Sequence, residues 1–175
     1  MSAFLHISKL DAAKRQLELA IRLFFNYDDV VAIHTLSSAA RDLLSDLAAK
    51  QGVKSIVYSQ MIEEVVKPEK QAEVRKIFNK AKNFFKHADK DPDALLKFNP
   101  EISEFDIWDA CELYRKLTQE NTPLVLLYIS WFYLKYNHLI LDSERKEKAL
   151  SLIKTFDPTN RGTFFSMLPD IEKVK

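Results

Sequence analysis

Only two glycines, Gly52 and Gly162, occur in the 175 residues of this chain. Glycine tolerates positive φ angles and the close approach of a ligand to the backbone, so phosphate-binding loops, dinucleotide fingerprints and tight hairpins depend on it. Because the two glycines are far apart, the sequence excludes a P-loop and a Rossmann-type nucleotide site. The glycine-flanked nucleophile elbow of serine hydrolases is also missing.

Apolar residues recur at intervals of three and four along most of the chain, and alternation with a period of two is nearly absent. This pattern predicts an all-α protein. We expect one domain over residues 1–175, an up-and-down bundle of about five to seven helices. The segment 53–66 fits either a short helix or an extended stretch. The other expected helices cover about residues 8–26, from Asp29 to near Gly52, 69–88, 103–119, 123–137 and 143–156, with a short helix after Thr163.

Several helix boundaries carry recognisable signals. Asp28 and Asp29 can accept hydrogen bonds from the first N–H groups of a helix. Ser103, with Asp106 three residues later, resembles a capping box. Pro123 suits the first turn of the most apolar helix, which we place in the middle of the bundle.

The sequence favours a cytoplasmic protein. Its one cysteine, Cys111, cannot form an internal disulfide or a thiolate zinc site, which fits a reducing compartment. The N-terminal residues lack the basic and apolar regions of a secretory signal. The longest apolar run, residues 123–136, is shorter than the roughly 20 residues that a membrane span needs. We therefore expect no membrane partner.

Charge is nearly balanced over the whole chain, with a formal net charge of +1. No global field therefore drives the protein onto nucleic acid or lipid. The segment from Lys67 to Lys90 differs, because it holds eight basic residues and three acidic ones. A local surplus of this kind can attract phosphate groups.

The motif that points most directly to chemistry is Lys82-Asn83-Phe84-Phe85-Lys86-His87. Helical spacing places Asn79 on one flank with the asparagine and histidine of the motif, and Lys76 and Lys80 lie nearby. Histidine can take up or donate a proton near neutral pH. Ammonium groups stabilise the charge that develops on a phosphodiester during cleavage. The arrangement therefore suits a site that acts on phosphodiesters.

This stretch resembles the signature of the HEPN superfamily, a group of all-helical domains marked by an arginine followed by four to six residues and a histidine. Asn83 matches the polar position that often follows the arginine, and His87 matches the histidine; Lys82 stands where the family has arginine. The resemblance implies a homodimer that brings two motifs together and acts on RNA as a metal-independent ribonuclease of a toxin or defence type. It implies no cofactor.

By this resemblance His87 is the catalytic acid or base, Asn83 an orienting donor and Lys82 a phosphate clamp. Lysine lacks the planar fork with which arginine grips a phosphate. If its side of the second helix faces His87, Arg41 supplies that missing cation. The residues expected to guide the RNA backbone are Lys76, Lys80 and Lys86.

The residues leave a second interpretation open. A histidine at the C-terminal end of a helix is favoured by the helix dipole, which also explains His87 and Lys86. The polar side of the second helix, with His34, Ser38 and Arg41, is then a solvated face. The alternative function is a non-catalytic helical interaction or scaffold protein with a protein partner.

Other constellations give no metal site. Asp89, Asp91 and Asp93 have the rhythm of a calcium loop, but Ala94 and Pro100 stand where glycine and glutamate are required, so we expect a solvated turn. No Glu-x-x-His pair occurs, which excludes a dinuclear carboxylate centre. The aromatic residues of the last third are interpreted as core or as a subunit interface rather than as a base-stacking platform: Tyr114, Tyr128, Trp131, Phe132, Tyr133 and Tyr136.

Overall fold

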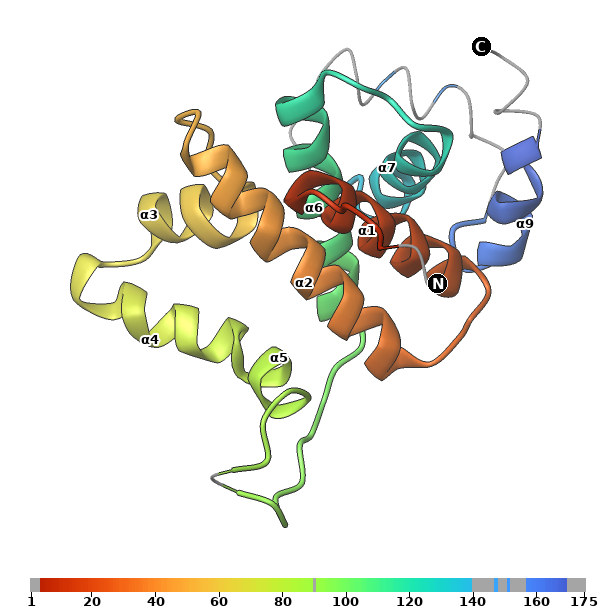
Figure 1. The fold of residues 1–175 in the computed structure, drawn as a ribbon. Coiled ribbons are helices and arrows are strands. Elements are labelled where there is room, and N and C mark those ends of the chain that lie inside the picture. Colours follow the sequence, from red (N-terminus) through yellow and green to blue (C-terminus); the bar gives the residue numbers. More distant parts are fainter. Residues whose placement is uncertain (1–3, 90, 140–146, 148–150, 152–156, 170–175) are drawn as a thin grey trace.

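The structure is a computed structural model that describes residues 4–89, 91–139, 147, 151 and 157–169 (Figure 1). Every regular element in this part of the chain is helical, which confirms the predicted all-α class. The helix expected over 143–156 falls outside the described residues, apart from Glu147 and Ser151. The elements are α1 (Lys9–Phe25), α2 (Val30–Ala49), the π-helix η1 (Ile56–Gln60), α3 (Met61–Val65), α4 (Pro68–Phe78), α5 (Lys80–Phe84), α6 (Ile102–Thr118), α7 (Pro123–Lys135) and α9 (Arg161–Ser166).

The body of the molecule is a bundle of α1, α2, α6 and α7. α2 packs against both α1 and α6, α7 contacts α1 and α6, and α9 lies against α1 and α7 (Figure 1). Their buried apolar side chains join into one hydrophobic cluster. α7 is apolar nearly all round and buries most of its side chains, as the sequence predicted. The predicted helical bundle is confirmed.

Aromatic side chains of α7 lie at the centre of this core. Tyr128 and Trp131 pack edge-on against Phe24 of α1, with ring centroids 5.3 and 4.7 Å away. Phe132 stacks on Trp108 of α6 at 4.7 Å. Such pairs add about 0.5–1.5 kcal/mol beyond the area they bury. The interpretation of these residues as core is confirmed, and their rings are not available to a second subunit or to stacked bases.

Two of the long helices begin where their sequence signals lie. Asp29 caps α2, because its carboxylate accepts a hydrogen bond of 2.8 Å from the Ala32 N–H. Pro123 occupies the first turn of α7. After α2 the chain turns at Gly52 with a φ of 71°, a conformation that glycine adopts without strain.

The helix expected over residues 69–88 is interrupted, and this prediction was wrong in its extent. α4 ends at Phe78, Asn79 forms the junction, and α5 ends at Phe84, so His87 lies in the turn that follows. An asparagine side chain competes for backbone hydrogen bonds, and asparagine is therefore a poor residue inside a helix. α4 also buries no residue, so tertiary packing does little to hold one long helix together.

The capping box expected at Ser103 and Asp106 is also wrong. α6 begins one residue earlier, after Glu101, and has no side-chain cap. Ser103 and Asp106 are instead buried within the helix, on the side that meets α2. A polar pair at a spacing of three residues fits either a helix start or a buried polar stripe, and only the packing partner distinguishes the two.

α4, α5 and the loop that leads to α6 form an arm at the edge of the bundle (Figure 1). Within the two helices of the arm only Ala81 is buried. α5 contacts α2, and so does Phe98 of the loop, which packs against His34. The arm carries the predicted motif. No helix in the described ranges is long and apolar enough to cross a membrane.

Candidate functional site

A buried polar network joins α2 to α6 behind the arm. Asp106 of α6 is fully buried and accepts a hydrogen bond of 2.6 Å from Nη1 of Arg41. The hydroxyl of Tyr58 donates to the same carboxylate oxygen, and the Arg41 guanidinium stacks on the Tyr58 ring at 3.7 Å. Burial opposes the charge on Arg41, but Asp106 raises the pKa of the guanidinium, so this cation stays charged inside the protein.

His34 extends the network towards the loop of the arm. Its Nδ1 lies 3.2 Å from the Ser103 hydroxyl and 3.4 Å from Oδ2 of Asp106. The rings of Phe85 and Phe98 pack edge-on against the imidazole. Burial, followed by the charges of Arg41 and of lysines on α5 and in the turn after it, lowers the pKa of His34 to about 4. The imidazole is therefore neutral near pH 7.

A second set of contacts ties α6 to the segment that follows α2. The Ser55 hydroxyl donates to Asp109 at 2.5 Å, and the backbone N–H groups of Ile56 and Val57 donate to the other oxygen at 2.8 and 3.3 Å. These bonds hold the first turn of η1 against α6. They thereby position Tyr58, the next residue of the same element.

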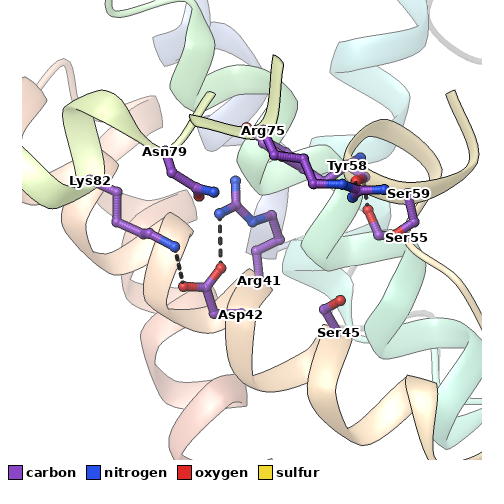
Figure 2. A pocket seen from close by; sticks show the side chains of 9 residues that line it. All are labelled: Arg41, Asp42, Ser45, Ser55, Tyr58, Ser59, Arg75, Asn79 and Lys82. Atoms are coloured by element: carbon purple, nitrogen blue, oxygen red, sulfur yellow. Dashed lines mark hydrogen bonds and ion pairs between the residues drawn. The ribbon is translucent and has the colours of Figure 1, made fainter. Parts of the chain in front are cut away.

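The surface next to the network is hollowed into a pocket of about 170 Å³ between α2, η1, α4 and α5 (Figure 2). We call it the polar pocket. Within it Asp42 accepts hydrogen bonds of 2.8 Å from Nη2 of Arg41 and 2.7 Å from Nζ of Lys82. Its lining consists of Arg41, Asp42, Ser45, Ser55, Tyr58, Ser59, Arg75, Asn79 and Lys82.

Three residues of the predicted motif, Asn83, Phe84 and His87, line a different and wider hollow of about 600 Å³, which we call the His87 groove. His87 is exposed there, beyond the end of α5. The groove brings a histidine, an amide and two ammonium groups together with two carboxylates and an aromatic ring. Its lining consists of Lys76, Lys80, Asn83, Phe84, His87, Asp89 and Asp91.

The structure divides the predicted site residues between these two hollows. His87, Asn83, Lys76 and Lys80 share the groove. Lys82 and Arg41 line the polar pocket, and both bind Asp42. Arg41 therefore does not supply a planar cation to His87. The alternative expectation that His34, Ser38 and Arg41 form a solvated face is also wrong, because all three side chains are buried. Lys86 is exposed in the turn after α5.

Sequence analysis missed the acidic residues of α6 as structural anchors. Besides Asp106 and Asp109, the buried Glu104 binds Lys135 at 2.7 Å, the Tyr136 hydroxyl at 2.7 Å and Arg161 at 3.1 Å. These three carboxylates stand among apolar residues on a helix that the core surrounds. The sequence signal for them was the presence of acidic residues among the apolar residues of one helix. A carboxylate in such a position is buried and requires hydrogen-bonding or charged partners.

No group of three metal-ligating side chains occurs among the described residues. Comparison of the chain with protein-family models, with curated proteins and with solved structures gives no match. The resemblance to the HEPN superfamily therefore depends on the six-residue motif and on the helical fold.

Proposed function

We propose that the protein is a HEPN-like RNA-binding protein that acts as, or derives from, a metal-independent ribonuclease. The observation that supports this most is the His87 groove, in which an exposed imidazole lies together with Asn83, Lys76 and Lys80. An imidazole needs access to its substrate to exchange a proton with it. A buried His87 with its hydrogen bonds satisfied would have had no such access.

Cleavage of RNA without a metal uses the 2′-hydroxyl of the substrate as nucleophile. In the proposed reaction His87 takes the proton of this hydroxyl, the 2′-oxygen bonds to phosphorus, and the bond from phosphorus to the 5′-oxygen breaks. The leaving 5′-oxygen takes up a proton, which His87 of a second copy can donate in a homodimer. Lys76 and Lys80 stabilise the charge on the phosphoryl oxygens.

The electrostatics of the groove limit how RNA can lie in it. Asp89 and Asp91 also line the groove and repel phosphates, so its two lysines do not make it basic on their own. Attraction depends on the surplus of the whole segment from Lys67 to Lys90, which includes the exposed Lys86. RNA should therefore bind by few phosphate contacts and with moderate affinity.

RNA binding as a function of salt tests the proposal. Wild-type protein should bind single-stranded RNA with a logarithmic salt slope of about −0.7 for each phosphate it neutralises. The double variant Lys76→Glu/Lys80→Glu should weaken binding at low salt and flatten the slope by roughly the two contacts it removes. Fluorescence anisotropy of a labelled oligonucleotide measures both quantities.

The double variant Lys50→Glu/Lys116→Glu is the matched control, because both lysines are exposed and neither lines the groove. It changes the net charge in the same direction and should leave the slope near that of the wild type. Equal losses in all the variants would mean that RNA responds only to net charge. Absence of RNA binding at low salt by folded wild-type protein would remove the proposal.

Exposed apolar side chains on and beside the arm favour a second candidate, a non-catalytic interaction protein. Val65, Ile77 and Leu95 are 72, 65 and 98% exposed. Apolar groups in such positions are typical of surfaces that dock another protein, and a second copy of this chain is the partner to test first. Under this candidate Ile77→Glu breaks a dimer seen by light scattering, and His87→Ala leaves it intact.

A further inference from the structure

The polar pocket has a lining suited to an anion, and this feature is independent of the His87 groove. None of its nine lining residues is aliphatic. Three of them are cations that reach the pocket from three different helices: Arg41 from α2, Arg75 from α4 and Lys82 from α5. In Figure 2 Arg41 and Lys82 reach Asp42, and the head of Arg75 lies beside Tyr58 and Ser59. Asp42 is its only carboxylate.

The pocket offers more hydrogen-bond donors than the protein itself uses. A guanidinium has five N–H donors and an ammonium has three. Arg41 gives one bond to Asp106 and one to Asp42, and Lys82 gives one to Asp42. Arg75 gives one to the Tyr58 carbonyl, and its Nη2 also lies 3.8 Å from Oε1 of Glu63. Donors therefore remain on each of the three cations.

Uncharged donors add to this surplus. Ser45, Ser59 and Asn79 line the pocket, and no side-chain hydrogen bond is recorded for them within the described part of the chain. Two hydroxyls and an amide thus face the same space as the three cations. A tetrahedral oxyanion, with several acceptor oxygens, would satisfy donors that arrive from different sides.

We infer that the polar pocket binds a phosphate group, either as inorganic phosphate or as the terminal phosphate of a larger molecule. Its volume of about 170 Å³ is several times the roughly 30 Å³ that one water occupies in the liquid, which gives room for a phosphate. The planar forks of Arg41 and Arg75 match the oxygens of a phosphate in pairs.

Asp42 is the carboxylate that already binds two of these cations. Burial opposes its charge, but hydrogen bonds from Lys82 and Arg41 lower the pKa of its carboxyl, so Asp42 is ionised near pH 7. A phosphate that enters competes with Asp42 for these two cations. Removing the charge of Asp42 should therefore strengthen phosphate binding, whereas a purely structural ion-pair network predicts no phosphate binding at all.

Isothermal titration with inorganic phosphate, at constant ionic strength and in EDTA, tests the inference. Wild-type protein should bind one phosphate, and Arg75→Gln should weaken the affinity by about tenfold or more, as expected for the loss of a charged hydrogen-bond donor. Asp42→Asn should strengthen it. Lys116→Met, a change at an exposed lysine outside the pocket, should leave it unchanged.

Ser59→Ala keeps the test valid if Arg75→Gln fails to fold, because Ser59→Ala removes one hydroxyl and no ion pair. This variant should weaken phosphate binding less than Arg75→Gln does.

Titration with a 5′-mononucleotide distinguishes free phosphate from the terminal phosphate of a larger molecule. If the nucleotide binds more tightly than inorganic phosphate, the pocket is assigned to a terminal phosphate. Folded wild-type protein that binds no phosphate overturns the inference. Binding that Asp42→Asn and Ser59→Ala both leave unchanged also overturns it, because the phosphate then lies elsewhere. RNA cleavage at His87 can succeed or fail independently of either result.

Discussion

Asp106 is the residue on which the buried polar contacts converge. It accepts hydrogen bonds from Arg41 and Tyr58, and His34 lies 3.4 Å from its second oxygen. An ion pair at this depth is costly to form, but it is far more costly to leave one partner alone. The main effect of the network is therefore to fix how α2 and α6 pack against each other. Its net contribution to the free energy of folding is small.

Asp106→Ala should lower the free energy of unfolding by about 3–5 kcal/mol, because it leaves the Arg41 charge buried without its carboxylate. Urea denaturation followed by circular dichroism measures the change. Asp46→Ala, at an exposed position of the neighbouring helix α2, should stay within about 0.5 kcal/mol of the wild type. A loss below about 1 kcal/mol for Asp106→Ala would show that the network is not buried as described.

His34 makes stability depend on pH in one direction. Its pKa is about 4 in the folded protein and near the ordinary 6.5 in the unfolded chain, so the unfolded state binds more protons between these values. The stability due to neutral His34 is complete above pH 6.5 and falls by up to roughly 3 kcal/mol as the pH drops to 4. Denaturation of wild type and His34→Asn over this range isolates the effect, because the other groups titrate in both. Parallel pH profiles would contradict it.

At the scale of elements, the arm and the bundle should differ in local stability. α4 buries no residue, whereas α2 and α6 are buried along much of their lengths. Helices without buried contacts open with little free energy. Amide hydrogen exchange should therefore be much faster in α4 than in α2 and α6. Equal protection in all three helices would contradict this difference in local stability.

α9 is held to the bundle by the buried side chain of Phe164, which belongs to the hydrophobic core, and by a charged contact with α6. Arg161 donates to Glu104 at 3.1 Å and stacks on the Phe24 ring at 3.8 Å. Glu104→Ala should cost about 3 kcal/mol of unfolding free energy and should raise hydrogen exchange in α9 before that in α2. The control is Glu101→Ala, since Glu101 is mostly exposed and lies 3.5 Å from Lys135, a pair worth less than about 1 kcal/mol. Equal costs for both variants would contradict the assignment.

For the whole molecule, the helical class and most of the long helices could be predicted because each signal is local. The cap at Asp29, the proline at the start of α7 and the period of the apolar residues act within one or two turns of helix. The break at Asn79 could not be predicted, because it reflects the lack of tertiary support for α4. Ser103 and Asp106 were misread for a related reason, since their partners are distant in sequence.

The candidate site was predicted in part for the same physical reason. Asn83, His87, Lys76 and Lys80 lie within twelve residues of each other, and this nearness in sequence was enough to bring them to one groove. The helical spacing itself failed at Asn79, which was expected on the flank of Asn83 and His87 but lines the polar pocket, because the helix is interrupted there. The places of Lys82 and Arg41 depend on how α5 meets α2, which no local pattern reports. The proposed action on RNA depends on the whole molecule, because it requires the His87 groove of one copy and His87 of a second copy.

RNA cleavage in EDTA, by wild-type protein and His87→Ala in parallel, tests the proposed function most directly. Wild type should cleave single-stranded RNA but not the matching DNA, because DNA lacks the 2′-hydroxyl nucleophile. His87→Ala should keep its helical circular dichroism and lose cleavage by a factor of about 10² or more, the contribution of one general acid or base. No cleavage by wild type, or equal cleavage by the two proteins, would contradict the catalytic role of His87 and would favour the interaction protein.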